Sequence, residues 1–321
     1  MRAIQVTAIG GPEVLVPTEL PDPVPGPGQL LVRVAASGVN YIDTYQRSGS
    51  YPMSLPFVPG SEGAGVVEAV GPGADPDLTG TRVAWATAPG SYAELAVVDA
   101  ASAVPVPDGV TDPEAASVLL QGMTAHYLVT STYPVQRGDT VLVHAGAGGT
   151  GLVLTQLAVA RGARVITTVS NAAKEELSRA AGATEVLGYG DDLAERVREL
   201  TEGDGVAAVY DGVGASTFDA SLAALRVRGT LALFGAASGP VPPVDPQRLN
   251  GAGSVFLTRP TLAHHVRSRE ELHWRAGEVL AAVLDGSLRL RVGARYPLAE
   301  AHRAHTELQS RATTGSLVLL P

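Results

Sequence analysis

A glycine-rich stretch after a short apolar run constrains the fold of this chain more than any other feature. Residues 140–143 read Thr-Val-Leu-Val, which is typical of a buried strand. Glycines follow at once in the spacing G-x-G-x-x-G, and an apolar helical pattern comes after them. A strand, a glycine turn and a helix in this order predict a dinucleotide site. The alternative is a glycine-rich surface turn, which would need neither a buried strand nor a helix beside it. The residues of the predicted phosphate loop are Gly146, Gly148, Gly149, Thr150 and Gly151.

Each glycine of the pattern has a physical role in holding a pyrophosphate. Gly146 permits the tight turn, Gly148 lets the backbone approach the phosphates, and Gly151 lets the helix lie close to the strand. The first turn of the helix offers free N–H groups and a partial positive charge. We therefore expect this loop to bind the phosphates of a dinucleotide cofactor.

The end of the next strand indicates which dinucleotide is bound. The strand expected over residues 163–169 is followed by Ser170 and Asn171, with no Asp or Glu. A site that prefers NAD usually has an acid there for the ribose hydroxyls. A hydroxyl, an amide and the nearby cation of Lys174 suit the 2′-phosphate of NADPH, which a carboxylate would repel. We expect NADPH, although Lys174 by itself can also be an ordinary solvated lysine.

Length and composition place the chain among ordinary globular proteins. Its 321 residues suffice for two domains, and it is 45% hydrophobic and 17% charged. The formal net charge of −9 argues against a nucleic-acid partner, which needs clustered Lys and Arg. No apolar run is long enough for a membrane span, and residues 1–6 enter a strand pattern directly. We expect a cytoplasmic protein with neither a nucleic-acid nor a membrane partner.

The chain has no cysteine, which excludes disulfides, thiolate catalysis and every Cys-ligated metal site. Seven histidines remain. His302 and His305 are spaced for one face of a helix, and His264 and His265 are adjacent, but neither pair has a third ligand nearby in the sequence. We expect packed or solvated histidines and no metal ligands.

The pattern of strands and helices changes along the chain. The first third is rich in strand candidates separated by Pro- and Gly-rich turns. From residue 140 to about residue 258 strands and helices alternate, which predicts a parallel sheet with helices on both faces. Capping boxes at 111–114 and 268–271 predict helices, the first extending to about Thr130. Another helix is expected near 298–310 and a last strand over Ser316–Leu320.

Several motifs resemble the medium-chain dehydrogenase/reductases. Residues 25–34 resemble the N-terminal signature of that family, and Gly60–Val67 resembles its Gly-His-Glu motif. Ser61 stands where the zinc-dependent members have a histidine ligand, and residues 37–40 lack their cysteine ligand. The resemblance therefore points to the zinc-free branch of the family.

Within that branch the chain is most similar to bacterial quinone oxidoreductases, relatives of zeta-crystallin. The matching segments are 40–45, 47–49, 51–52, 121–125, 258–260 and 310–313. The resemblance implies an α/β protein with a GroES-like β-barrel catalytic domain of residues 1–122 and 262–321. It implies a Rossmann domain, a doubly wound parallel sheet that binds NADPH, over residues 123–261. It also implies a homodimer formed through an edge strand near Gly253–Thr258.

The same resemblance assigns residues to the cofactor. Ser170, Lys174, Tyr189 and Arg311 would surround the 2′-phosphate. Arg259 and Arg311 can alternatively form ordinary surface ion pairs. The resemblance implies that the rest of the cofactor is lined by Asn40, Tyr41, Thr124, Gly214, Phe234, Gly235, Leu257, Thr258 and Arg259.

The chemistry expected of such a site needs no metal. A quinone accepts hydride to form a delocalised phenolate, so oriented hydrogen-bond donors can suffice. The candidate catalytic residues are Asn40, Tyr45 and Tyr51, whose amide or phenol groups can reach a carbonyl oxygen. The two tyrosines can equally be packing residues of the cleft wall. Asp43 is expected to be a structural hydrogen-bond acceptor and not a general base.

We therefore expect a zinc-independent NADPH:quinone oxidoreductase that transfers reducing equivalents from NADPH to a quinone in a cleft between two domains. An enzyme of the same fold that reduces the C=C bond of 2-alkenals or enones is an alternative. A third reading is an NADPH-binding protein with little turnover. Relatives of zeta-crystallin include RNA-binding proteins, but the acidic composition counts against RNA here.

Overall fold

The computed structural model describes residues 1–321, which divide into two compact units. The first unit comprises Met1–Met123 and Val266–Pro321, and the second comprises Thr124–His265. We describe each unit by itself. Helix α2 (Asp112–Tyr127) contains the point at which the chain passes from the first unit to the second.

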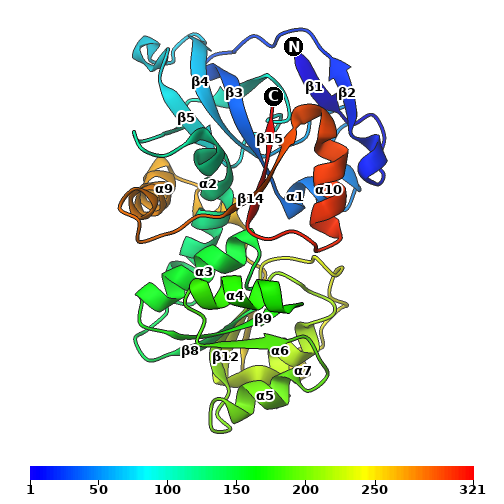
Figure 1. Ribbon diagram of the computed structural model, residues 1–321, viewed down its shortest axis with the longest axis vertical. Coiled ribbons are helices and arrows are strands. Elements are labelled where there is room, and N and C mark those ends of the chain that lie inside the picture. The colour runs from blue at the N-terminus through cyan, green and yellow to red at the C-terminus, as the bar shows by residue number, and fades with distance from the viewer. The chain divides into compact units, whose positions relative to one another are not determined.

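A mixed sheet of seven strands forms the body of the first unit (Figure 1). Its order is β14-β15-β3-β4-β5-β7, with β6 also paired to β3. The long β3 pairs antiparallel with β4, β6 and β15, which makes it the centre of the sheet. The strand bounds are β3 (Gln29–Val39), β4 (Glu62–Val70), β5 (Arg82–Trp85), β6 (Leu95–Asp99), β7 (Val104–Pro105), β14 (Val292–Pro297) and β15 (Ser316–Leu320).

Alternation of side chains along β3 builds the core of this sheet. Leu30, Val32 and Val34 point to one face because successive side chains of a strand alternate. They form one buried cluster with Trp85 and Val98 from neighbouring strands. Every second residue of this part of β3 is therefore apolar because it lies on the buried face of the sheet.

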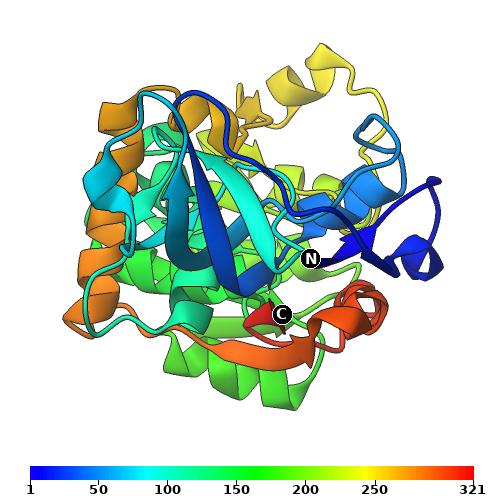
Figure 2. The same cartoon turned by 90° about the horizontal axis from the view of Figure 1, so that it is seen from above.

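The beginning of the chain lies against its C-terminal helix, α10 (Ala301–Gln309), as Figure 2 shows in dark blue and red. The N-terminal segment contains β1 (Arg2–Gln5), the turn η1 (Pro12–Val14) and β2 (Val16–Glu19). Its apolar side chains and those of α10 belong to a single buried cluster, which includes Ile4, Val6, Leu15, Ala301 and Ala304. The other elements of this unit are α1 (Tyr41–Arg47), η2 (Pro76–Leu78), α9 (Arg269–Leu284) and η4 (Leu298–Glu300).

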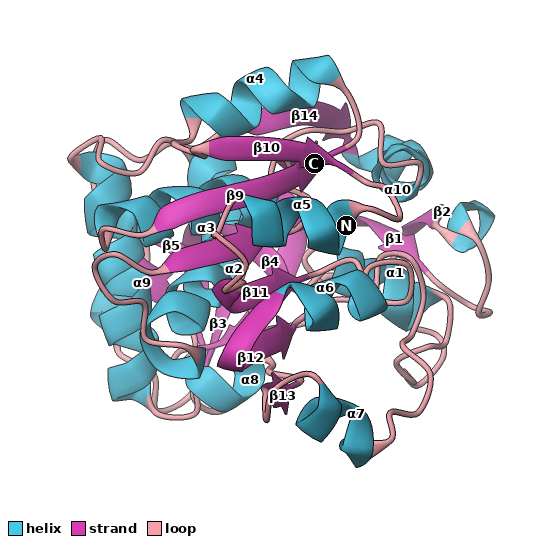
Figure 3. Cartoon of the chain, turned by 90° about the horizontal axis from the view of Figure 1, so that it is seen from below, coloured by secondary structure: helices cyan, strands magenta, loops and turns pink.

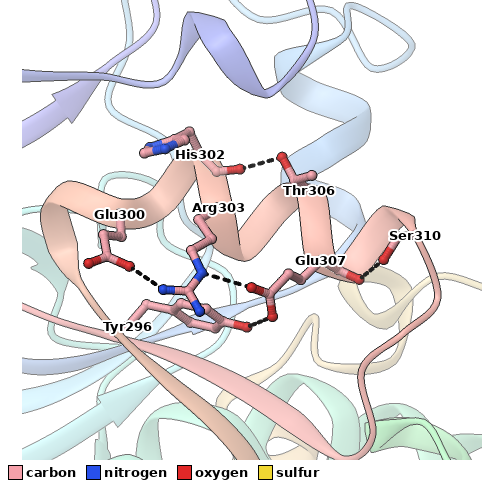
Figure 4. Close-up of polar contacts among 7 residues, drawn as sticks. All are labelled: Tyr296, Glu300, His302, Arg303, Thr306, Glu307 and Ser310. Atoms are coloured by element: carbon pink, nitrogen blue, oxygen red, sulfur yellow. Dashed lines mark hydrogen bonds and ion pairs between the residues drawn. The ribbon is translucent and has the colours of Figure 1, made fainter.

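An exposed ion-pair network joins α10 to β14 (Figure 4). Arg303 forms ion pairs with Glu300 at 3.0 Å and with Glu307 at 2.8 Å, and its guanidinium lies 5.5 Å from the ring centre of Tyr296. Tyr296 donates a hydrogen bond to Glu307 at 2.6 Å. Exposed pairs of this kind contribute only about 0–1 kcal/mol each, so the buried face of α10 contributes more to its anchoring.

A parallel sheet of six strands forms the second unit (Figure 3). Its order is β10-β9-β8-β11-β12-β13, so the winding direction reverses between β8 and β11. Right-handed crossovers then place the helices before and after the reversal on opposite faces. The strand bounds are β8 (Thr140–Val143), β9 (Arg164–Val169), β10 (Glu185–Gly188), β11 (Val206–Asp211), β12 (Leu225–Leu233) and β13 (Phe256–Thr258). The helix bounds are α3 (Gly149–Ala160), α4 (Ala172–Ala180), α5 (Leu193–Glu199), α6 (Phe218–Ala224), α7 (Pro246–Gly251) and α8 (Leu262–His265).

The structure departs from the sequence expectations mainly at short elements. The α-helix expected to reach about Thr130 ends at Tyr127 and continues as a π-helical turn, η3 (Leu128–Thr132). The elements β2, β10, β14 and α1 were not expected, because four to seven residues carry too little periodicity to be recognised. No helix of this protein combines the length and the apolarity that a membrane crossing requires.

Candidate functional site

The glycine loop lies between β8 and α3, as expected, but the first glycine of the motif acts differently from the expectation. The left-handed backbone conformation falls on Ala145, with φ 53°, and not on Gly146. A Cβ on Gly146 would come within 2.6 Å of the Thr167 Cβ, so Gly146 is required for close packing and not for the turn. A Cβ on Gly151 would collide with the carbonyl oxygen of Ala145. Two of the three motif glycines therefore serve close approach of chain segments.

The N-terminus of α3 is open for an anion. Gly148 is its N-cap and provides no side-chain cap, and α3 begins with Gly149, Thr150 and Gly151. The first N–H groups of a helix have no partner within the helix, so an uncapped end can donate them to phosphate oxygens. The loop thus retains the donors that a pyrophosphate needs.

A hollow of about 390 Å³ lies at the carboxyl ends of β9 and β10. Ser170, Asn171 and Tyr189 line it, and Tyr189 accepts a hydrogen bond from the Ala145 N–H at 3.1 Å. The hollow is therefore joined to the glycine loop. Lys174 does not line it, although its backbone N–H donates to Asn171 and so caps α4.

Glu175 also lines this hollow and was not among the predicted site residues. Its carboxylate accepts a hydrogen bond from Arg179 at 2.9 Å, and the two form an ion pair one helical turn apart. The guanidinium offsets the negative charge at the place where a phosphate is expected.

A buried series of hydrogen bonds begins at His144, directly before the glycine loop. The His144 ring nitrogens lie 2.9 Å from Thr168 Oγ1 and 2.9 Å from Ser221 Oγ. Ser221 in turn donates to Asp211 at 2.7 Å. Burial lowers the pKa of His144, against the opposing charge of Asp211, so a neutral ring is favoured. The sequence carried no signal that would single out His144 or Asp211.

Asp211 also shapes the loop after β11. Its Oδ1 accepts the N–H groups of Val213 at 2.8 Å and Gly214 at 2.9 Å. Gly214 has a φ of 94°, a conformation that favours glycine. Phe234 donates its N–H to the Asp211 carbonyl, and a Cβ on Gly235 would meet the Gly212 backbone. The predicted residues Gly214, Phe234 and Gly235 are thereby brought together.

The remaining predicted residues of the second unit lie at two other places. Thr124 is buried in α2. Leu257 and Thr258 lie in β13, paired with β12, and Arg259 follows directly. The β13 strand is the edge of the sheet, and Phe256 on it is 61% exposed.

In the first unit, Asn40 is the centre of a buried hydrogen-bond chain. It precedes α1 as the N-cap and is 5% exposed. Asn40 Nδ2 donates to Glu62 at 2.8 Å, and Asn40 Oδ1 accepts from Gln121 at 3.1 Å. Gln121 accepts from the Ser316 hydroxyl at 2.9 Å. Residues from four distant parts of the chain therefore fix the orientation of one carboxamide.

Two buried carboxyls face Asn40. Glu62 also accepts the Leu120 N–H at 2.8 Å, and burial raises its pKa to about 8. Asp43 accepts the Asn40 N–H at 2.8 Å and the Ser61 hydroxyl at 3.2 Å, and burial raises its pKa to about 6. Asp43 is thus a hydrogen-bond acceptor, as expected, whereas Glu62 was not among the predicted site residues.

His305 is a packed histidine. Its Nδ1 lies 3.2 Å from Arg47 and its Nε2 lies 3.0 Å from the Tyr92 hydroxyl, which donates to Asp43. Arginine only donates, so Nδ1 accepts and Nε2 carries the proton. Burial, with a smaller effect of Arg47, lowers the pKa of His305 to about 3.

The three predicted tyrosines form one aromatic group. The ring centres of Tyr41 and Tyr45 are 6.2 Å apart, and those of Tyr45 and Tyr51 are 5.3 Å apart. Tyr51 is 43% exposed. The Tyr41 hydroxyl donates to the Leu308 carbonyl at 3.0 Å, and the Arg311 N–H donates to the same oxygen at 3.1 Å. The end of α10 is thus tied to α1.

No group of three or more His, Asp or Glu side chains is arranged to hold a metal ion. Ser61, at the position of the family's histidine ligand, is instead hydrogen-bonded to Asp43.

Two family models match the chain. The alcohol dehydrogenase GroES-like domain matches residues 26–108, and the zinc-binding dehydrogenase family matches residues 149–276. The expected combination of a GroES-like domain with a Rossmann-type parallel sheet is confirmed by these matches and by the strand order.

Individual relatives match over almost the full length. A quinone oxidoreductase of Pseudomonas aeruginosa is 46% identical, over 100% of this chain and 99% of its own. A 2-haloacrylate reductase of a Burkholderia species is 41% identical, over 97% of this chain and 96% of its own. A mycobacterial protein whose structure was solved in complex with NADPH has 62% sequence identity and a TM-score of 0.98, with 100% of both chains covered.

Proposed function

This chain belongs to the quinone oxidoreductases, a zinc-free family of medium-chain dehydrogenase/reductases, and we propose that it reduces a quinone with NADPH. Residues 1–122 and 262–321 are proposed as the catalytic domain, and residues 123–261 as the NADPH-binding domain. The cofactor supplies the hydride, and the side chains of the protein orient the acceptor.

The hollow at the ends of β9 and β10 is the observation that carries the choice of NADPH. It joins the uncapped glycine loop through Tyr189, and Ser170 supplies a hydroxyl where an NAD site would have an acid. We assign the 2′-phosphate to this hollow, with Ser170 and Tyr189 as donors and the cations of Lys174 and Arg311 as charge partners. The 62% identical mycobacterial protein solved with NADPH supports the same cofactor.

The remaining cofactor contacts are assigned by the same proposal. The pyrophosphate is assigned to the N-terminus of α3, where unpartnered N–H groups and the helix dipole favour negative charge. The rest of the nucleotide and the nicotinamide are assigned to Asn40, Tyr41, Thr124, Gly214, Phe234, Gly235, Leu257, Thr258 and Arg259.

The residues present do not suit a catalytic zinc. Ser61 is engaged with Asp43, and cysteine is absent from the chain. We therefore assign stabilisation of the reduced quinone oxygen to hydrogen-bond donors. Asn40 Nδ2 has one hydrogen on Glu62 and a second for an acceptor oxygen, and Tyr45 and Tyr51 offer an aromatic surface with phenol donors.

The test of this proposal follows NADPH oxidation by the purified protein with a simple para-quinone and with a 2-alkenal, each with and without a chelator. We expect turnover of the quinone that the chelator does not change. Loss of turnover with chelator, or no quinone reduction, would contradict the proposal.

Reduction of an activated C=C bond is the second candidate function. The observation that favours it is the 2-haloacrylate reductase, which is 41% identical to this chain. Both reactions need hydride transfer to a conjugated acceptor, so the same residues can serve either. Faster turnover of the 2-alkenal in the same assay would favour this function. Tight NADPH binding without turnover of either acceptor would favour a binding protein.

Two further points belong to the proposal. A homodimer formed through the β13 edge is supported by the exposed Phe256, since an unpaired edge with an apolar side chain favours association. A cytoplasmic location remains an expectation, which cell fractionation would test.

A further inference from the structure

Glu62 is a buried carboxyl that the proposed reaction does not use directly. Its side chain is completely buried. Placing such a group in the interior is costly unless hydrogen bonds compensate. Its side chain accepts hydrogen bonds from the Leu120 N–H and from the Asn40 amide. One of these two bonds is made to a candidate catalytic side chain.

The bonds around Asn40 run in one direction. The Ser316 hydroxyl donates to Gln121, Gln121 donates to Asn40 Oδ1, and Asn40 Nδ2 donates to Glu62. Glu62 Oε1 accepts from the Leu120 N–H and Oε2 accepts from Asn40 Nδ2, so the NH₂ end of the Asn40 carboxamide faces the carboxyl. The Glu62 carboxyl, at the end of this series of hydrogen bonds, therefore decides the orientation of the Asn40 and Gln121 amides.

We propose that Glu62 is a positioning residue: its hydrogen bond to Nδ2 fixes the Asn40 carboxamide and thereby the direction of its second amide hydrogen. This inference rests on the proposed function, in which that hydrogen meets the oxygen of the acceptor. Glu62 itself does not touch the reacting atoms. It acts only through Asn40.

The substitution Glu62→Gln isolates this role because it changes almost no volume. The Leu120 N–H needs an acceptor, so the new side chain must present its carbonyl oxygen there. Its NH₂ group then faces Asn40, which must turn over to present Oδ1. Gln121 turns over in the same way, and the Ser316 hydroxyl can accept at the end. In this reversed series of hydrogen bonds each of these amides keeps a donor and an acceptor, so the variant is expected to fold.

The experiment compares wild type, Glu62→Gln, Asn40→Ala and the double variant in para-quinone reduction. We expect Glu62→Gln to lower kcat by about ten-fold or more, because misplacing a positioned donor is costly in the transition state. NADPH affinity should stay unchanged. In the Asn40→Ala background the same substitution should change kcat by less than about two-fold, since a residue that acts through another has no separate effect.

Tyr92→Phe is the matched control. It removes a buried hydroxyl that donates to Asp43 and leaves the Asn40 side chain untouched. We expect it to lower the melting temperature while kcat stays near that of wild type. A loss of kcat in Tyr92→Phe as large as in Glu62→Gln would overturn the positioning role in favour of a general structural effect.

Two other results would overturn the inference while leaving quinone reduction intact. One is a Glu62→Gln variant with the kcat of wild type. The other is the same loss with and without Asn40. If wild type reduces no quinone, the proposed function fails, and the orientation is read from the side-chain amide signal of Asn40 in ¹⁵N-labelled protein. The inference then stands if Glu62→Gln shifts that signal and falls if it does not.

Discussion

At the scale of single residues, the chemistry of this protein depends on polar groups whose ionisation or direction is set by burial. Desolvation is the largest cause of the pKa shift in four buried groups. It favours the neutral ring of His144 and His305 and the protonated carboxyl of Glu62 and Asp43. The exposed residues Arg311 and Tyr51 are different, because the role proposed for each of them depends on a bound ligand. One residue of each kind, Arg311 and Glu62, can be tested by substitution.

Arg311→Ala should weaken NADPH binding by about ten-fold or more and leave NADH binding nearly unchanged. The reason is that a charge-assisted contact with the 2′-phosphate exists only for NADPH. Fluorescence titration with both cofactors measures the difference. Arg295→Ala on β14 removes another exposed arginine and should change neither affinity. Equal weakening of both cofactors would contradict the assignment of Arg311.

Glu62 should make the protein less stable as pH rises from about 6.5 to 8. Burial raises its pKa from 4.5 to about 8, so in this window the folded chain holds a proton that the unfolded chain has released. The free energy of unfolding then falls as pH increases. Asp43, with a pKa raised to about 6, has its effect mostly below this window. His305 and His144, with pKa values lowered from 6.5, have the opposite sign and raise stability with pH at the lower edge of the window, so the effect of Glu62 is read from the comparison with Glu62→Gln.

Urea unfolding at several pH values measures this effect. The midpoint for wild type should decrease across the window, and the midpoint for Glu62→Gln should decrease less or stay constant. Parallel pH profiles for the two proteins would rule out Glu62 as the source.

At the scale of elements, the contact of α3 with the preceding loop shows how a glycine motif works here. The left-handed residue is Ala145, while Gly146 and Gly151 leave room for other segments. The motif was recognised from its spacing, but the physical role of each glycine depended on which atoms lie opposite. Neighbours such as Thr167 and Ser178 come from β9 and α4, which no local pattern could reveal.

Two helical glycines give a paired prediction. Gly151→Ala should lower both stability and NADPH affinity, because its Cβ would collide with the Ala145 carbonyl oxygen. Gly277→Ala in α9 meets no atom within 4 Å and should stabilise the protein by about 0.5–1 kcal/mol. Thermal unfolding and NADPH titration of both variants measure the contrast. A stable Gly151→Ala variant with normal affinity would show that the loop can shift.

At the scale of the whole molecule, each unit is recognisable from its sequence, although its connections are not. The alternation from residue 140 to 258 indicated a parallel sheet, and the strand order confirms it. The N-terminal strands and the C-terminal strand β15 were expected separately. Their meeting in one sheet, with β15 beside β3, required long-range pairing.

Phe256→Lys should shift the protein from dimer to monomer. A charge on an exposed edge strand opposes pairing with a second copy, which is a common way in which proteins protect sheet edges. Sedimentation velocity measures the oligomeric state. Val24→Lys, at an 85% exposed position in a loop of the first unit, is the matched control and should leave the assembly unchanged. A dimeric Phe256→Lys variant would exclude this edge as the interface.

The sequence by itself determined the elements whose signals are local. The glycine loop, the acid-free end of β9 and the capped helices could be predicted because each depends on neighbouring residues. The family resemblance added the candidate residues Asn40, Tyr45 and Tyr51. Only the tertiary structure decided that Ser316, Gln121, Asn40 and Glu62 form one directed chain. A hydrogen bond needs two groups within about 3 Å, and the pairing of strands distant in sequence sets those distances.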